Sequence, residues 1–255
     1  MGVFPMVNVN SVVIKLGGSV LFPRDVSSDL FLEKIRCLVN FVSFAREFND
    51  SLKIFFVIGG GSWAKSYIRF AESLGVPPIV RDLFGIEISR LNAFIVVHLL
   101  KRFLRNVRIY NGVPKTPEEA LRVSSHSDII VLGGFYPGQS TIGTAALLAE
   151  IVEADLLLIG TDVNGVYLSD PKKNVNAKKF DTISIGELVR ILSGLEVKPG
   201  TYMLMDLVAA KVLERAKIPC IVFDVSKCEN LFKVYEAFIK EDFEKIYEVG
   251  TLIVR

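Results

Sequence analysis

Glycines follow four short apolar runs of this 255-residue chain, and their positions suggest a chemistry. The runs end in Gly17-Gly18, Gly59-Gly60-Gly61, Gly133-Gly134 and Gly160. A glycine loop lets a ligand approach the backbone, and a helix that begins after it presents unpaired N–H groups and a partial positive charge. Such loops suit the binding of phosphate groups.

Any one of these loops has an ordinary alternative, because turns from a strand to a helix often contain glycine. Four of them in one chain favour a ligand site. Neither the dinucleotide fingerprint G-x-G-x-x-G nor the Walker A motif G-x-x-x-x-G-K-[ST] is present. Phosphate would therefore be held by a different scheme, and a dinucleotide-dependent oxidoreductase is set aside.

Lys15 stands inside the first apolar run, just before Gly17-Gly18. One interpretation is a cation directed at a phosphoryl group in transfer, and the alternative is a solvated lysine at the edge of a sheet. Phosphoryl transfer depends mainly on positioning and charge neutralisation. Glycine-loop amides, Lys15 and Mg²⁺ can supply both.

Short apolar runs alternate with longer stretches of helical period, which predicts an α/β protein with a largely parallel sheet. The predicted strands are 11–16, 53–58, 107–110, 128–132, 155–160 and 219–224. The predicted helices are 28–48, 62–75, 85–104, 141–152, 186–193 and 206–217, and a helix at 227–240 and a strand at 242–254 follow. Ligands collect at the carboxyl ends of strands in such sheets.

The composition predicts a folded protein with a small-molecule partner. The chain is 51% hydrophobic and 23% charged, enough for a sizeable core. A net charge of +2, with no block of like charge, gives no reason to expect a nucleic-acid partner. No apolar run approaches the roughly 20 residues that cross a bilayer, and no leader is evident, so we expect a soluble, cytoplasmic protein without a membrane partner.

The cysteines and histidines show no metal-binding pattern. Cys37, Cys220 and Cys228 are odd in number and far apart, and we interpret them as core or surface thiols of a reduced compartment. His98 falls in an apolar helical pattern and is predicted to lie in the core or at an interface, whereas His126 is in a loop. Neither histidine has a partner at ligand spacing, so no zinc site is expected.

Six segments resemble the amino acid kinase superfamily and, within it, the uridylate (UMP) kinases of the archaeal type. They are IKLGGSVL (14–21), VIGGGSWAKSYI (57–68), RDLFGIEISRLNA (81–93), LGGFYPGQSTIGTAALLAE (132–150), ADLLLIGTDVNGVYLSDPKK (154–173) and GTYMLMDLVAAKVLERAKI (200–218). The resemblance implies one domain over 1–255, a three-layer sandwich around a mainly parallel sheet. Residues 1–150 would form the acceptor lobe, and residues 151–255 would form the ATP lobe.

The resemblance also implies transfer of the γ-phosphoryl group of Mg-ATP to UMP in pyrimidine nucleotide biosynthesis, with Lys15 as the catalytic cation. ATP would be bound by Gly18, Ser19, Gly61, Lys65, Thr161, Asp162, Tyr167 and Asp170. UMP would be bound by Gly60, Asp82, Phe135, Tyr136, Pro137, Gly138, Gln139, Ser140 and Thr141. Mg²⁺ would be held through the ATP phosphates, and a homo-oligomer, a hexamer in the family, is expected.

Four residues near these motifs have open alternatives. Lys65 stands where archaeal relatives commonly carry arginine, and is either a phosphate ligand or a helix-surface lysine. Asp82 either contacts the UMP ribose or caps the helix predicted to begin at residue 85. Arg90 either reaches acceptor phosphate or is an exposed helix arginine. Asp206 is predicted to be a helix N-cap rather than an acid that organises the phosphate-binding groups.

The segment GTDVNGVYLSDP (160–171) is a turn rather than a calcium loop, because no glutamate follows at the required position. Asn164-Gly165 is a strong reverse-turn pair. UMP kinases typically read T-N-V-D-G-V-Y, whereas this chain reads T-D-V-N-G-V-Y. Asp162 could repel phosphate, accept a hydrogen bond from ribose or recruit Mg²⁺.

Two rival classes share the same fold family. Isopentenyl phosphate kinases carry a histidine three positions after the serine of the GGGS loop, where this chain has Lys65. Molybdenum storage proteins bind nucleotide without catalysis, but their cargo chambers need more histidines than the two in this chain.

Overall fold

The structure, a computed structural model, describes residues 7–25, 27–194 and 205–255. Its centre is a seven-stranded sheet in the order β3-β2-β1-β4-β6-β7-β5. Neighbouring strands are parallel except β6 and β7, which are antiparallel. The strands are β1 (Ser11–Leu16), β2 (Lys53–Ile58), β3 (Ile129–Leu132), β4 (Leu156–Thr161), β5 (Thr182–Ser184), β6 (Cys220–Asp224) and β7 (Gly250–Val254).

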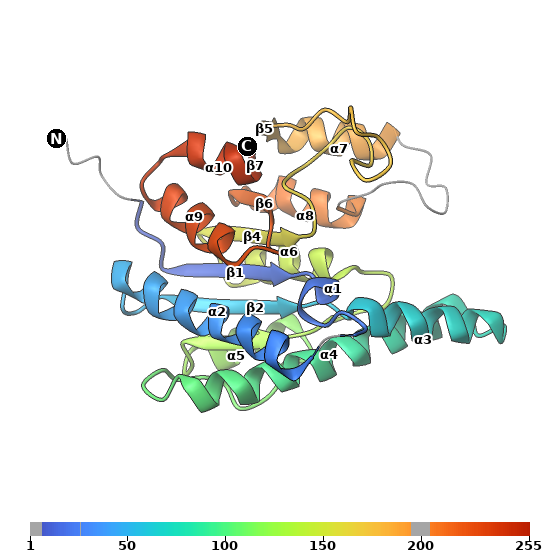
Figure 1. The fold of residues 1–255 in the computed structure, drawn as a ribbon, viewed down its shortest axis with the longest axis horizontal. Coiled ribbons are helices and arrows are strands. Elements are labelled where there is room, and N and C mark those ends of the chain that lie inside the picture. Colours follow the sequence, from blue (N-terminus) through green and yellow to red (C-terminus); the bar gives the residue numbers. More distant parts are fainter. Residues whose placement is uncertain (1–6, 26, 195–204) are drawn as a thin grey trace.

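Helices cover both faces of this sheet. They are α1 (Gly18–Leu21), α2 (Ser28–Phe48), α3 (Gly61–Ser73), α4 (Pro78–Phe103), α5 (Pro117–Ser124), α6 (Thr141–Ile151), α7 (Ile185–Gly194), α8 (Leu207–Ala216), α9 (Cys228–Ile239) and α10 (Phe243–Val249). In Figure 1, α2 and α9 lie in front of the sheet and α3 projects away from the body of the molecule.

The alternation of side chains along the strands produces two cores. On β1, Val12, Ile14 and Leu16 pack with α2, α4, α9 and α10, while Val13 packs on the opposite face with α5, α6, α7 and α8. Successive side chains of a strand point to opposite faces, so Lys15 lies on the same face as Val13. The predicted three-layer sandwich around a mainly parallel sheet is confirmed.

Most predicted elements are present. The strands predicted at 11–16 and 53–58 and the helix predicted at 28–48 have the predicted bounds. The helix predicted at 85–104 begins at Pro78, because proline fits the first turn of a helix, where its missing N–H would have no partner.

Two predictions of secondary structure were incomplete or wrong, and some short elements were missed. The strand predicted at 107–110 is only an isolated bridge between Ile109 and Ile129. The segment 242–254 contains α10 before β7, because a helical run precedes Gly250. The short elements α5 and β5 were not predicted. Both have fewer residues than a clear periodic pattern needs.

Helix α4 is longer and more apolar than the sequence analysis allowed. By length and composition alone it could cross a membrane, but 39% of its most apolar window is buried in the protein. A core helix of a soluble protein passes the same test, so this is weak evidence of a membrane span. His98 lies on the exposed side of α4, edge-on to Phe94 with ring centroids 4.4 Å apart. The core alternative for His98 was therefore wrong, and the interface alternative stays a prediction.

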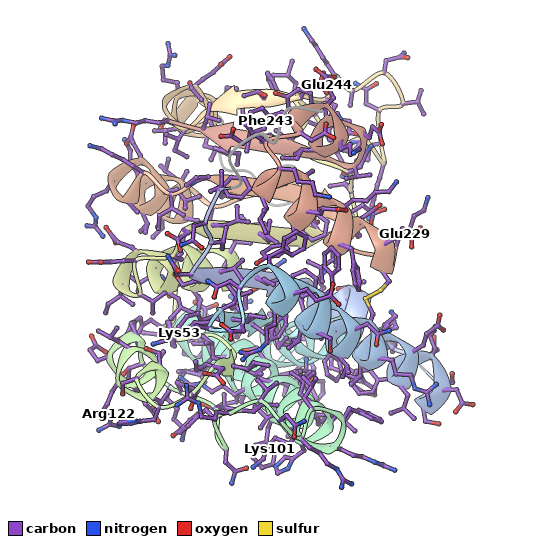
Figure 2. All side chains as sticks on the ribbon, turned by 90° about the vertical axis from the view of Figure 1, so that its left-hand side faces the viewer. Lys53, Lys101, Arg122, Glu229, Phe243 and Glu244 are labelled. Atoms are coloured by element: carbon purple, nitrogen blue, oxygen red, sulfur yellow. A yellow bond between two sulfur atoms is a disulfide. The ribbon has the colours of Figure 1, made fainter. Side chains whose placement is uncertain are left out.

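Two of the three cysteines form a disulfide, which corrects their interpretation as free thiols. Cys37 of α2 is bonded to Cys228, the first residue of α9. Figure 2 shows this sulfur–sulfur bond beside Glu229. The fold brings together residues 191 positions apart, which spacing in the sequence could not indicate. Cys220 is a buried free thiol in β6, as expected of a core cysteine.

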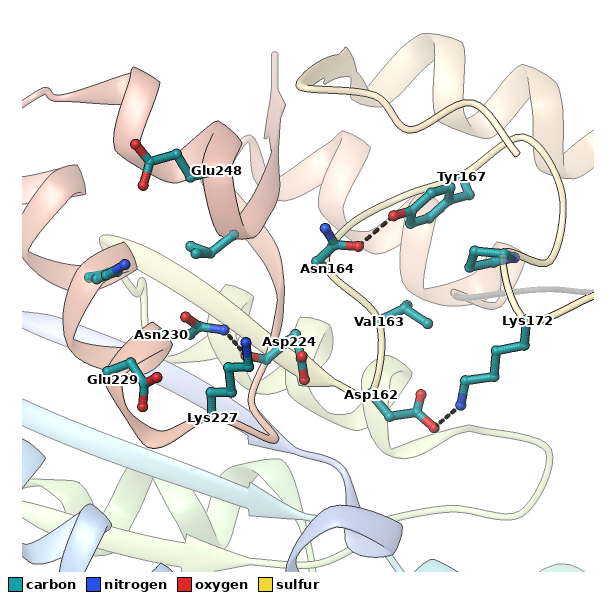
Figure 3. Close-up of a pocket in the computed structure, with 13 residues that line it drawn as sticks. Asp162, Val163, Asn164, Tyr167, Lys172, Asp224, Lys227, Glu229, Asn230 and Glu248 are labelled. Carbon is teal, nitrogen blue, oxygen red and sulfur yellow. Dashed lines mark hydrogen bonds and ion pairs between the residues drawn. The ribbon is translucent and has the colours of Figure 1, made fainter. Parts of the chain in front are cut away.

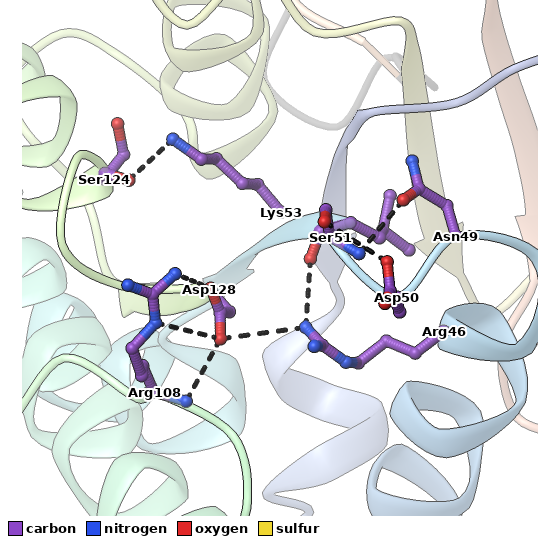
Figure 4. Close-up of polar contacts among 9 residues, drawn as sticks. Arg46, Asn49, Asp50, Ser51, Lys53, Arg108, Ser124 and Asp128 are labelled. Carbon is purple, nitrogen blue, oxygen red and sulfur yellow. Dashed lines mark hydrogen bonds and ion pairs between the residues drawn. The ribbon is translucent and has the colours of Figure 1, made fainter.

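A buried carboxylate closes the amino-terminal end of β3 (Figure 4). The Asp128 side chain is only 11% exposed, and it accepts hydrogen bonds from Arg108 Nη2 at 2.6 Å and Nε at 3.3 Å. Arg46 Nη1 of α2 lies 3.8 Å away. Burial alone would raise the pKa of Asp128, but the hydrogen bonds and charge of Arg108, with Arg46, outweigh it and hold the pKa below its usual value.

We expect Asp128→Asn to lower the free energy of unfolding by about 1–3 kcal/mol at pH 7, because the charged hydrogen bonds are lost. A depressed pKa contributes stability above the unfolded-state value near 3.9, and this contribution is lost as pH falls through the folded-state pKa. Urea unfolding between pH 7 and about pH 2, a range that extends below the lowered pKa, measures the difference. Asp50→Asn, at an exposed position of the same end, is the control. A difference that does not shrink toward low pH would contradict this account.

Candidate functional site

The four glycine loops meet at one edge of the sheet. Strands β3, β2, β1 and β4 are adjacent and parallel, so their carboxyl ends lie side by side. The loops after β1 and β2 touch through backbone atoms: a Cβ on Gly18 would lie 2.3 Å from Gly59 O and Gly61 N. Gly61 has a φ of +66°, which favours glycine, and a Cβ on Gly61 would collide with the backbone of Gly18. Two bare backbone loops thus abut where phosphate binding was predicted.

The first cavity, of about 590 Å³, lies between α3, α4 and the loop that leads into α6. Eight predicted site residues line it: Gly60, Gly61, Lys65, Asp82, Gly138, Gln139, Ser140 and Thr141. Phe135, Tyr136 and Pro137 belong to the same loop but lie outside the lining. Phe135 is buried and Tyr136 is exposed. Six residues predicted for UMP therefore share one cavity with two predicted for ATP.

Asp82 is inside α4 and does not cap it. The helix begins four residues earlier, at Pro78, so the alternative of a cap is wrong. The Asp82 carboxylate accepts a hydrogen bond from the Gly138 N–H at 2.8 Å. It holds the loop after β3 against α4.

Asn92 makes the equivalent connection to the loop after β2. Its side chain is buried, and Nδ2 donates to Gly59 O at 3.0 Å and to Gly60 O at 3.3 Å. Sequence reasoning missed this residue, because a polar side chain within an apolar helix gives no sign of its partner. Helix α4 therefore holds both loops that border the first cavity.

Asp206 is the N-cap of α8, as predicted, and it has a second partner. Its Oδ1 accepts from Ala209 N at 2.7 Å, and its Oδ2 accepts from Ser140 Oγ. Ser140 is itself the N-cap of α6 and accepts from Ile142 N and Gly143 N at 3.1 and 3.0 Å. The amino termini of α6 and α8 are thereby joined at the wall of the first cavity.

The second cavity, of about 430 Å³, lies between the loop after β4 and the first turn of α9 (Figure 3). Asp162 and Tyr167, both predicted for ATP, line it with Asn164. The other predicted ATP residues lie outside its lining: Gly18 and Ser19 in α1, Thr161 at the end of β4 and Asp170 in the following turn. Lys227, Glu229 and Asn230 of the α9 region, also on the lining, were not predicted.

Asp162 is paired with a lysine that sequence reasoning missed. Lys172 Nζ binds Asp162 Oδ2, and the Tyr167 hydroxyl donates to Asn164 Oδ1 (Figure 3). Burial would raise the pKa of Asp162, but the hydrogen bond and charge of Lys172 outweigh it and lower the pKa. The carboxylate is therefore charged at neutral pH and has a counter-charge ten residues along the chain.

Lys15 is a buried cation in the interior strand β1, so the alternative of a solvated edge lysine is wrong. It is 8% exposed, and Nζ donates to Gly160 O at 3.4 Å. Burial lowers its pKa to about 8. The charge of Asp162 acts against this shift and that of Lys65 adds to it. Because Asp162 lines the second cavity and Lys65 the first, Lys15 is coupled to both.

Comparison with known proteins identifies the family. The model of the amino acid kinase family matches residues 10–224. This chain belongs to the amino acid kinase family. The two glycine loops and the lysine before the first of them thus lie in an amino acid kinase domain, as the resemblance implied.

Uridylate kinases are among the most similar relatives of this amino acid kinase. The enzyme of Archaeoglobus fulgidus is 37% identical over 222 residues, which cover 87% of this chain and 94% of that protein. The uridylate kinase of Methanoculleus marisnigri is 36% identical over 225 residues, which cover 88% of this chain and 91% of that protein.

Solved structures agree with the fold. The crystal structure of the A. fulgidus uridylate kinase has a TM-score of 0.76 at 36% identity and covers 95% of this chain and 99% of that chain. The UMP kinase of Bacillus anthracis has the same TM-score at 22% identity, with 96% of each chain covered, which supports the fold alone.

The charges around Lys15 predict two opposite shifts in this amino acid kinase. We expect Asp162→Asn to lower the pKa of Lys15 below about 8, and Lys65→Met to raise it, because the first removes an attraction and the second a repulsion. NMR titration of isotope-labelled lysine side chains measures both. Lys101→Met, a change at an exposed position in the last turn of α4, is the control. Equal titration of Lys15 in all variants would contradict the coupling.

Proposed function

We propose that this protein is a UMP kinase, which transfers the γ-phosphoryl group of Mg-ATP to UMP and yields ADP and UDP for pyrimidine nucleotide biosynthesis. The observation that carries the proposal is one buried lysine coupled to a residue of each of two cavities. Two cavities suit two nucleotides, and a cation that interacts with a charged residue of each suits the group that passes from one to the other. The relatives are named uridylate kinases, which supports UMP as the nucleotide that accepts the phosphoryl group.

In this proposal the first cavity receives UMP and the second receives the nucleoside of ATP. Residues 1–150 supply the acceptor side, and residues 151–255 the ATP side. Gly18, Ser19 and Gly61 present backbone to the phosphates, and Gly61 begins α3, whose N–H groups and dipole favour anions. Lys65, one turn further along α3, adds a point charge.

The Lys15 ammonium neutralises charge on the phosphoryl group as it moves. The pKa of about 8 leaves Lys15 mostly protonated near neutral pH, and its position on the sheet is held by pairing with both neighbouring strands. The phosphate of UMP is already ionised near neutral pH, so the reaction needs no strong general base. Positioning and charge account for the chemistry.

Mg²⁺ would enter with the ATP phosphates. Two acids that line the cavities, Asp162 and Asp206, already bind Lys172 and the Ser140 hydroxyl. A metal that keeps most of its ligands as water and phosphate oxygens fits such a site better than one that needs a protein cage. When bound, Mg²⁺ supplies further neutralisation of phosphate charge.

The proposal includes assembly into a homo-oligomer, specifically a hexamer. Large apolar side chains are exposed along two neighbouring helices: Trp63, Tyr67 and Phe70 on α3, and Leu91 and Phe94 on α4. Exposed apolar surface of this extent is typical of contacts between subunits.

The activity is tested by a coupled assay with Mg-ATP and each of UMP, CMP, isopentenyl phosphate, acetylglutamate and carbamate. We expect ADP release that depends on UMP. Release with isopentenyl phosphate alone would identify a different kinase of the same family. Release with none of the acceptors would overturn a catalytic function.

We expect Lys15→Met to lower kcat by about 10²–10³-fold, the range for loss of one charge-stabilising group, with no loss of thermal stability. In the wild type, kcat/KM should fall as pH rises through about 8, because the ammonium loses its proton there. Lys15→Arg, which stays charged, should lack this fall in whatever activity it retains. Equal turnover of Lys15→Met and wild type would remove Lys15 from the mechanism.

The double variant Asp162→Asn with Asn164→Asp tests the ATP side. It removes a negative charge from position 162 and releases Lys172 to bind phosphate, so we expect KM for ATP to fall several-fold while KM for UMP stays constant. The Tyr167 hydroxyl can still donate to a carboxylate at position 164. Steady-state kinetics with each substrate varied gives both constants. Unchanged ATP kinetics would mean that the exchange is a neutral variation of a turn.

A further inference from the structure

The guanidinium of Arg90 binds three backbone carbonyls of the acceptor side. Nε donates to Gly134 O at 3.1 Å, and Nη2 donates to Phe135 O and to Lys115 O, each at 3.2 Å. Nη1 pairs with Glu87 at 2.6 Å. The side chain is only 16% exposed, so the prediction of an exposed helix arginine was wrong. Its N–H groups are directed at protein oxygens, which leaves the other alternative, a phosphate ligand, without support.

The residue beside Arg90 holds the same loop. Ser89 is 1% exposed; its Oγ accepts from Gly134 N at 2.8 Å and donates to Ile86 O at 2.6 Å. A Cβ on Gly133 would lie 2.6 Å from Arg90 N, so the loop rests directly on the backbone of α4. Both the N–H and the C=O of Gly134 are therefore bound by neighbouring residues of one helix.

This attachment reaches the wall of the first cavity. The loop after β3 contributes Gly134, Gly138, Gln139, Ser140 and Thr141 to the lining. Arg90 and Ser89 fix the beginning of the loop at Gly134, and Asp82 fixes Gly138, four residues further along. Arg90 also ties in the separate segment at Lys115, just ahead of α5.

Arginine is suited to this task for a geometric reason. Its planar fork donates in several fixed directions, and here those directions lead to carbonyls of two separate segments. A lysine ammonium at the same place is a compact point charge and cannot hold the carbonyls in one plane. Three carbonyl dipoles gathered on one cation set the position of the loop more closely than packing of its exposed residues would.

We propose that Arg90 is a positioning residue that sets the shape of the acceptor cavity and thereby selects UMP over CMP without touching either nucleotide. The inference rests on the proposed UMP kinase function. Uracil and cytosine differ only in the donors and acceptors of one edge, so their discrimination depends on polar groups held in place to about 1 Å. The loop that Arg90 holds carries Gly138, Gln139 and Ser140 of the lining, whose amide and hydroxyl groups can hydrogen-bond to such an edge.

The test compares Arg90→Met with Arg90→Lys and with a matched control, Arg102→Met. Arg102 is on the same helix but exposed, so its loss removes the same charge without touching the loop. For Arg90→Met we expect KM for UMP to rise about tenfold or more, the preference for UMP over CMP to fall, and KM for ATP to stay constant. Arg90→Lys should be intermediate, and Arg102→Met should match the wild type.

Hydrogen exchange of the amides in 133–141 is the second measurement, and it does not require activity. We expect faster exchange in Arg90→Met and Arg90→Lys than in wild type and Arg102→Met. Unchanged exchange in both Arg90 variants would overturn the inference, even if the wild type fails to phosphorylate UMP and the proposed function is lost. Faster exchange with an unchanged preference for UMP over CMP would overturn the role in selection. If Arg90→Met does not fold, Arg90→Lys decides by the same two measurements.

Discussion

The burial of one ammonium group, that of Lys15, is the constraint on which the site depends. Burying a charge costs free energy unless partners compensate, and within the described residues the direct partner is a single carbonyl, Gly160 O, at 3.4 Å. The lowered pKa records the incomplete compensation. An anion placed beside Lys15 would supply the missing negative charge. The positive charge of Lys65 also disfavours the protonated form of Lys15, so the same anion would offset that repulsion. The folded protein is therefore poised for phosphate before any ligand is present, which is the condition for efficient electrostatic catalysis.

The loops that surround this cation have few side chains of their own to hold them. Gly18, Gly59 and Gly61 approach one another so closely that side chains cannot be accommodated, and such backbone needs support from elsewhere. Helix α4 provides it. Asn92 binds the carbonyls after β2, Arg90 those after β3, and the apolar side of the same helix is buried in the core. One rigid element thus positions two loops, which preserves their relative geometry.

The two ends of the sheet have different roles: ion pairs stabilise the fold at one end, and the ligand cavities lie at the other. At the amino-terminal end of β3, the Asp128 carboxylate is saturated by Arg108 and approached by Arg46. At the carboxyl ends, the two cavities are open to partners, and the buried Lys15 ammonium has one carbonyl within hydrogen-bond distance among the described residues. The disulfide between Cys37 and Cys228 joins the half of the chain that contains α2 to the half that contains α9. It attaches α9 beside Glu229 and Asn230, which line the second cavity.

Local pattern in the sequence determined the strands β1 and β2, the helix α2, the glycine loops and the N-cap at Asp206, because each follows from periodicity or from turn and capping chemistry within a few residues. It also indicated Lys15, since a lysine inside an apolar strand is unusual. Only the tertiary structure decided the partners of Arg90 and Asp82, the Lys172 counter-charge and the disulfide. These contacts join positions 10 to 191 residues apart, and a single sequence holds no local signal for which distant group a polar side chain will meet. The sheet order and the crossovers that bring those groups together are consequences of packing two cores at once.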